Sequence, residues 1–146
     1  MNSKFLKDPH WYIALLLGGT FWLLYGFFIQ PLKINSVFEP LTVLIFSVLL
    51  YPIVEEIVFR GLLQDFIGQR MGVARNYWGL SLANILTSVV FALSHLINQV
   101  PIWALLTFFP SLVYGYFKDR HQSILPGMLL HSFYNLGFIT LIAHYE

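Results

Sequence analysis

The chain has 146 residues, of which 58% are hydrophobic and only 10% are charged, and its formal net charge is +1. This composition, with a mean hydropathy of +0.70, is typical of an integral membrane protein and gives no basic surface for nucleic acid. The absence of cysteine excludes disulfides, thiolate catalysis and Cys-ligated metal centres.

The apolar runs predict an all-α fold, a polytopic bundle of about five transmembrane helices in a single membrane domain, 1–146. Each run is about as long as a helix needs to cross the hydrocarbon core of a bilayer. In chain order the runs cover residues 11–29, 41–63, 78–97, 100–117 and 123–144. Apolar side chains recur along the more polar stretch that follows, so the second helix either continues or bends into an interfacial helix. We expect it to continue to about Gly68, because a longer second helix places Glu55 deeper in the membrane, closer to the depth of the histidines on the other helices.

Basic residues near the ends of these runs predict the orientation. Lysine and arginine accumulate in cytoplasmic loops. One side of the predicted bundle carries Lys4, Lys7, Arg70, Arg75, Lys118 and Arg120, whereas the other side carries only Lys33. We therefore expect the N-terminus in the cytoplasm and the C-terminus outside.

Charged residues within the second apolar run are the first candidates for function. An ionisable group inside a span costs roughly 2.5–3.5 kcal/mol on insertion scales, so its presence favours a functional role. Glu56 and Arg60 are four residues apart and are expected to pair on one helix face. Glu55 is rotated by about 100° from Glu56 and would stay available for proton transfer. The alternative is a Glu–Arg clamp with Glu55 facing water.

A proline lies close to these glutamates. Pro52 precedes Glu55 by three residues and has no backbone N–H, so in an α-helix it would free the carbonyl of Val48. The alternative is an ordinary transmembrane proline without a functional role.

Two other runs contain polar residues at i, i+4 spacing. Phe91 precedes His95 in the third run, and His131 precedes Asn135 in the fifth. A histidine can polarise water or a carbonyl, and an asparagine amide can donate to an oxyanion. Each pair alone is also consistent with helix packing or an interhelical clasp. Other small or polar residues are interpreted as helix contacts: Gly18, Gly19, Gly26, Asn84, Thr87, Ser88 and Gly115.

The order and spacing of these motifs carry a family resemblance. The motifs are Glu55-Glu56-x-x-x-Arg60, Phe91-x-x-x-His95 and His131-x-x-x-Asn135. Over about residues 41–138 the chain resembles the CAAX protease and bacteriocin-processing (CPBP) family, the glutamic intramembrane endopeptidases.

The resemblance implies a role for each motif residue. Glu55 and His95 would activate the water that attacks a peptide carbonyl. His131 and Asn135 would stabilise the oxyanion. Glu56, Arg60 and Phe91 would support the site, without a metal or another cofactor.

The resemblance also implies a membrane-associated peptide or protein as substrate. Prenylated C-terminal peptides, peptide pheromones, bacteriocin leaders and C-terminal sorting tags all fit such a family. The small size favours a processing or sorting protease in a bacterial cytoplasmic membrane, as a multi-pass protein within the lipid bilayer. The oligomeric state is not predicted.

The sequence is also consistent with two alternative functions. One is a metal-dependent membrane hydrolase, because Glu55, His95 and His131 are residue types that bind zinc, although the chain lacks an HExxH-type spacing. The other is a non-catalytic membrane protein, such as an immunity or chaperone-like factor that retains a polar cavity.

Overall fold

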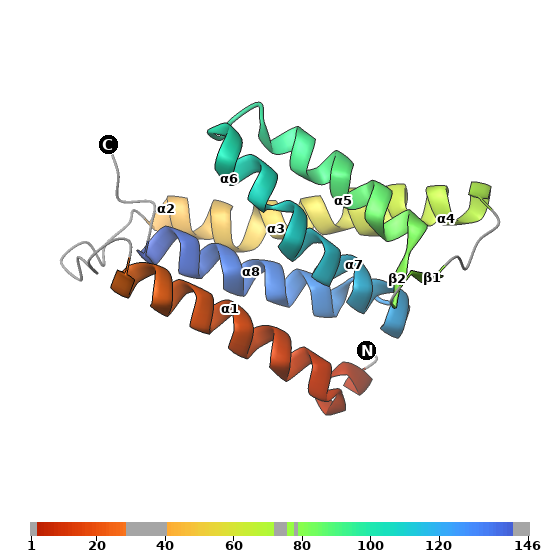
Figure 1. Ribbon diagram of the computed structural model, residues 1–146, viewed down its shortest axis with the longest axis horizontal. Coiled ribbons are helices and arrows are strands. Elements are labelled where there is room, and N and C mark those ends of the chain that lie inside the picture. Colours follow the sequence, from red (N-terminus) through yellow and green to blue (C-terminus); the bar gives the residue numbers. More distant parts are fainter. Residues whose placement is uncertain (1–2, 29–40, 72–75, 78, 142–146) are drawn as a thin grey trace. The chain divides into compact units, whose positions relative to one another are not determined.

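The structure, a computed structural model, describes residues 3–28, 41–71, 76–77 and 79–141. These residues are mostly helical, as the sequence predicts (Figure 1). The described strands form a small antiparallel hairpin of β1 (Asn76–Tyr77) and β2 (Leu80–Ser81). Gly79 in its turn has a φ of 85°, which glycine adopts without strain.

The chain divides into two compact units, which are described separately. Unit 1 comprises Met1–Ile53 and Leu129–Glu146, and unit 2 comprises Val54–Met128. The division falls within two helices, α3 (Tyr51–Glu56) and α8 (Leu125–Leu141).

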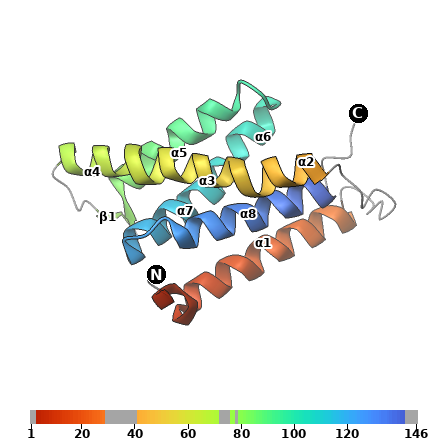
Figure 2. The same cartoon turned by 180° about the vertical axis from the view of Figure 1, so that it is seen from behind.

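Unit 1 is built around α1 (Pro9–Phe28) and α8, which run side by side in both ribbon views (Figures 1 and 2). Small residues allow this approach, since a Cβ added at Gly18 would overlap the ring of Tyr134. The hydroxyl of Tyr134 donates to the carbonyl of Ala14 at 2.8 Å. The unit's remaining elements are a 3-10 turn (Ser3–Lys7), α2 (Leu41–Leu44), a wider π-helical segment (Ile45–Leu50) and the first residues of α3.

Unit 2 contains a second π-helical segment and the helices that pack on it. Its elements are the end of α3, the π-helical segment Ile57–Gln64, α4 (Asp65–Met71), the hairpin, α5 (Leu82–His95), α6 (Pro101–Leu106), α7 (Phe108–His121) and the start of α8. Helix α5 packs against α7, α4 and the π-helical segment. The Ser81 hydroxyl accepts a hydrogen bond from the Asn84 N–H at 3.0 Å and so caps α5, as serine commonly does at an N-cap.

The helix lengths bear on the predicted spans. Among the residues that the structure describes, two helices are long and apolar enough to cross a membrane, Pro9–Phe28 and Leu41–Arg70. The second is continuous past Gly68, which confirms the expected extension. In the described part of the third run the helix covers Leu82–His95, and the fourth run is divided at Thr107 between α6 and α7. The count of about five spans and the cytoplasmic N-terminus therefore stay predictions.

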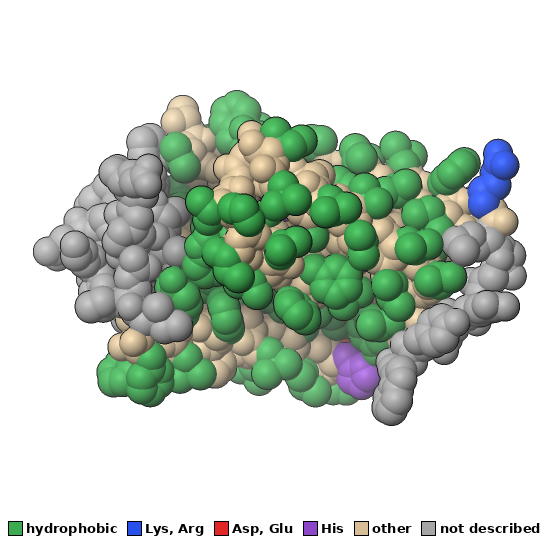
Figure 3. Space-filling view, turned by 45° about the horizontal axis from the view of Figure 1, so that its top comes forward, with side chains coloured by type: hydrophobic (Ala, Val, Ile, Leu, Met, Phe, Trp, Pro, Cys, Tyr) green, Lys and Arg blue, Asp and Glu red, His purple; other side chains and the backbone are tan. Residues whose placement is uncertain are grey.

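In unit 2, several polar side chains are buried and many large apolar ones are exposed. Glu56, Arg60 and Asn84 are fully buried, whereas Val90 and Leu93 are about half exposed. Figure 3 shows one face of the molecule on which hydrophobic side chains predominate. Apolar surface of this extent is costly in water and is suited to contact with lipid.

Candidate active site

Glu56 and Arg60 form a buried ion pair in unit 2. Glu56 Oε2 lies 3.7 Å from Arg60 Nε, and both side chains are 0% exposed. The expected pairing at i, i+4 is therefore confirmed. An isolated buried charge is costly, so each member of this pair depends on the other.

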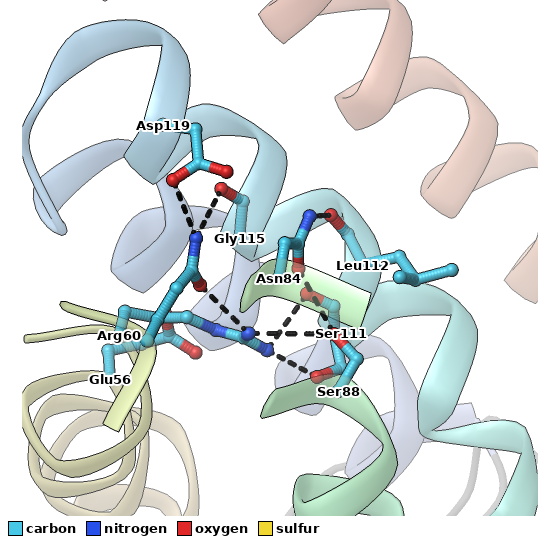
Figure 4. Close-up of polar contacts among 9 residues, drawn as sticks. Glu56, Arg60, Asn84, Ser88, Ser111, Leu112, Gly115 and Asp119 are labelled. Carbon is cyan, nitrogen blue, oxygen red and sulfur yellow. Dashed lines mark hydrogen bonds and ion pairs between the residues drawn. The ribbon is translucent and has the colours of Figure 1, made fainter. Parts of the chain in front are cut away.

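The guanidinium of Arg60 links three helical elements (Figure 4). Its Nη1 donates to Gln64 Oε1 at 3.2 Å and to Ser88 Oγ at 3.5 Å. Its Nη2 donates to the Ser111 carbonyl at 2.8 Å and also contacts the Ser111 hydroxyl. The Cζ of Arg60 also lies 5.8 Å from the centroid of the Phe91 ring. The arginine thus joins the glutamate-bearing helix to α5 and α7.

The polar network extends beyond the predicted residues. Gln64 Nε2 donates to Asp119 Oδ1 at 2.8 Å and to the Gly115 carbonyl at 3.2 Å. Ser81 Oγ donates to Asp119 Oδ2 at 2.6 Å. Sequence reasoning missed Gln64 and Asp119. The available signal for Gln64 was its position four residues after Arg60, in line with Glu56.

A second part of the network involves Asn84, which the sequence assigned to helix contacts. Its Nδ2 donates to the Leu112 carbonyl at 2.9 Å, and its Oδ1 accepts from Ser88 Oγ at 3.1 Å. A Cβ added at Gly115 would overlap the Asn84 amide, so α7 approaches α5 closely at this glycine. The interpretation of Asn84 as a helix contact is confirmed, and so is that of Gly115 as a position where helices approach closely.

An ion pair lies at the polar end of α7, just after the predicted span 100–117. Lys118 Nζ contacts Asp65 Oδ1. Burial lowers the pKa of Lys118, and the negative charge of the adjacent Asp119 opposes that shift. This pair ties α4 to α7.

The two adjacent glutamates have different environments. Glu56 is fully buried against Arg60, whereas Glu55 is only partly buried. The negative charge of a carboxylate buried against a guanidinium compensates the positive charge of the arginine. Adding a proton to that carboxylate would leave the arginine charge uncompensated, so such a carboxylate is poorly suited to proton transfer. Glu55 is the better placed of the two to meet water.

Phe91 and His95 lie on one face of α5. Their ring centroids are 4.4 Å apart, and Phe59 packs edge-on against Phe91 with centroids 5.0 Å apart. His95 Nδ1 lies 2.9 Å from the Phe91 carbonyl oxygen. A carbonyl oxygen only accepts, so Nδ1 carries the hydrogen. In neutral His95, Nε2 is therefore the acceptor nitrogen.

His131 and Asn135 lie one turn apart on α8, in unit 1. His131 is 3% exposed. The Asn135 amide is engaged, because Nδ2 donates to the Ser47 carbonyl at 2.9 Å. The prediction that Pro52 frees the Val48 carbonyl assumed α-helical turns. The preceding turns are π-helical, with hydrogen bonds to the fifth residue back, so Ser47 is the carbonyl opposite Pro52.

The predicted site residues are thus divided between the units. Unit 2 holds Glu55, Glu56, Arg60, Phe91 and His95, and unit 1 holds His131 and Asn135. Within the described ranges, no group of three or more His, Asp or Glu side chains is arranged to hold a metal ion. The metal-dependent alternative gains no support from this geometry.

Comparison with known families identifies the chain more closely. The sequence model of the family described as type II CAAX prenyl endopeptidase Rce1-like matches residues 36–137. No curated protein and no solved structure matches the chain. The match includes all three motifs and agrees with the resemblance to CAAX proteases. The family consists of membrane proteases, which are hydrolases that act on membrane-associated proteins. This chain is accordingly a membrane protein that belongs to the Rce1-like type II CAAX prenyl endopeptidase family.

Proposed function

We propose that the chain is a glutamic intramembrane endopeptidase that cleaves a membrane-associated peptide or protein. The observation that carries this proposal is the unequal burial of the two glutamates. Glu56 is fixed by Arg60 at 0% exposure, while Glu55, its neighbour on α3, is only partly buried. One carboxylate supports the helix and the other serves as base.

In the proposed reaction, Glu55 accepts a proton from water as the water oxygen attacks the substrate carbonyl carbon. Neutral His95 accepts a hydrogen bond from the same water at Nε2, because its Nδ1 hydrogen is used on the Phe91 carbonyl. The carbonyl becomes an oxyanion. His131 and the second amide hydrogen of Asn135 stabilise it.

The tetrahedral intermediate then collapses. The C–N bond breaks, and the proton held by Glu55 passes to the leaving nitrogen. No covalent enzyme intermediate forms, and no external oxidant or reductant is needed. Glu56, Arg60 and Phe91 hold the helices that carry the base and the histidine.

We also propose that the protein crosses a bacterial cytoplasmic membrane about five times, with the N-terminus in the cytoplasm. Its substrate would be a single membrane-anchored protein that is processed or sorted. The apolar exterior of unit 2 and the two long apolar helices support this placement.

The test compares protein termini in native-host membranes that carry wild type or Glu55→Gln at equal abundance. New termini that require Glu55 would establish proteolysis and identify the substrate. An unchanged set of termini would refute the proposal and favour a non-catalytic role. If Glu56→Gln abolishes these termini and Glu55→Gln does not, the assignment of base and support is reversed.

A matched variant separates the chemistry of His95 from its packing. In His95→Asn the amide nitrogen can occupy the position of Nδ1 and keep the hydrogen bond to Phe91, but nothing replaces Nε2. We expect the cleavage to be lost while the melting temperature in detergent stays within a few degrees of wild type. Cleavage that persists in His95→Asn would exclude His95 from water activation.

A further inference from the structure

The turn before Pro52 contains a carbonyl that the backbone cannot satisfy. The Tyr51 N–H donates to the Phe46 carbonyl, five residues back. In the same register the next carbonyl, Ser47, faces Pro52. Proline has no N–H, so this helical hydrogen bond is missing.

The side chain of Asn135 supplies the missing donor. Its Nδ2 lies 2.9 Å from the Ser47 oxygen. Ser47 and Asn135 are both partly buried. Backbone groups in an apolar environment require a partner, and side chains of neighbouring helices often provide one beside a proline. Ser47, Pro52 and Asn135 all lie in unit 1.

We propose that Asn135 is a positioning residue, which replaces the backbone donor omitted at Pro52 and thereby fixes the start of α3. Glu55 is three residues beyond Pro52 on that helix. A shift of the turn at Ser47 would rotate the start of α3 and redirect the Glu55 carboxylate. The consequence for cleavage rests on the function proposed above, whereas the structural link does not.

A four-member set tests this role: wild type, Asn135→Ala, Pro52→Ala and the double variant. Alanine at position 52 restores a backbone N–H, which supplies Ser47 directly in π-helical turns and through Tyr51 in α-helical turns. We expect Asn135→Ala to lower Glu55-dependent cleavage at least tenfold. Pro52→Ala in the same chain should recover at least threefold of that loss.

Part of the cleavage activity lost in Asn135→Ala will not be recovered by Pro52→Ala. That part measures how much the Asn135 amide stabilises the oxyanion, because a backbone N–H at position 52 cannot replace this contact. If Pro52→Ala raises the cleavage activity of Asn135→Ala by less than threefold, and the activity losses of the two single variants multiply in the double variant, the positioning role is refuted. A second variant, Asn135→Asp, places an acceptor against the Ser47 carbonyl. It should be less active than Asn135→Ala.

Tyr134→Phe is the matched control. It removes another hydrogen bond from α8, to the Ala14 carbonyl in the same unit. Pro52→Ala should not rescue it, since that bond does not involve Ser47. Rescue of both variants would indicate general stabilisation and would refute the inference.

Melting temperatures of the same purified variants in detergent make the test independent of cleavage. We expect Pro52→Ala to raise the melting temperature of Asn135→Ala and not that of Tyr134→Phe. If wild type produces no Glu55-dependent termini, the proposed function fails, and this comparison alone decides the inference. If Pro52→Ala then changes the melting temperatures of Asn135→Ala and Tyr134→Phe by the same amount, the inference about Asn135 is refuted.

Discussion

Removal of the Arg60 guanidinium is the most direct test of the buried network. Arg60→Met keeps a long side chain that can pack near Phe91, but leaves Glu56 as a charge at 0% exposure. Breaking a buried ion pair by removing one partner costs about 3–5 kcal/mol. The hydrogen bond from Arg60 to the Ser111 carbonyl is also lost, which adds to the cost.

The expected loss is large against the total stability of a domain, which is about 5–15 kcal/mol. We therefore expect Arg60→Met to lower the free energy of unfolding by at least about 3 kcal/mol. A second change, Glu56→Gln, removes the uncompensated charge. The double variant should be more stable than Arg60→Met, although it carries one more substitution.

The measurement is reversible unfolding in mixed detergent micelles, with helicity followed by circular dichroism. Arg70→Met is the matched control, because Arg70 is an exposed arginine on the same long helix, 5.3 Å from the Phe66 ring centroid. It should cost less than about 1 kcal/mol, the range of an exposed cation–π contact. The reasoning fails if Arg60→Met is no more destabilising than Arg70→Met, or if Glu56→Gln gives no recovery.

Other substitutions test neighbouring contacts by the same unfolding measurement. Gly115→Ala should destabilise by about 1–3 kcal/mol through overlap with Asn84, and Asn84→Ala in the same chain should relieve part of that cost. Thr87→Val should be neutral or stabilising, because the buried Thr87 hydroxyl has no hydrogen-bond partner among the described residues. A stability loss above about 1 kcal/mol would show that the hydroxyl has a partner. Lys118→Met should cost less than about 1 kcal/mol, since Asp65 is 44% exposed and water screens the pair.

The sequence predicted the contacts that depend on helical spacing alone. Glu56 and Arg60 pair as expected, and the Phe91 and His95 rings meet on one face of α5. The long second helix was also predicted. These features follow from the i, i+4 geometry of one continuous helix, so they need no knowledge of how helices pack.

The partners of Arg60 on other helices could not be predicted. Ser111 is 51 residues away in the chain and meets the guanidinium because α7 packs against the π-helical segment that carries Arg60. Serine is common at helix contacts in membranes, so its presence in an apolar run does not identify a particular partner. Ser88 and Gly115 were usable signals, since both were assigned to helix contacts, but neither assignment named the residue on the other side.

The Asn135 contact shows how one unpredicted backbone feature changes the interpretation of a motif. Spacing arguments assume hydrogen bonds to the fourth residue back, which assigned the Val48 carbonyl to Pro52. In π-helical turns the acceptor shifts by one residue, to Ser47, whose oxygen accepts from the Asn135 amide. Asn135, which is expected to stabilise the oxyanion, thus also donates to the Ser47 carbonyl the hydrogen bond that Pro52 cannot donate. Loss of activity on replacing Asn135 cannot by itself identify an oxyanion donor, because either contact would produce that loss. Only restoration of the backbone donor at position 52 separates the two contributions.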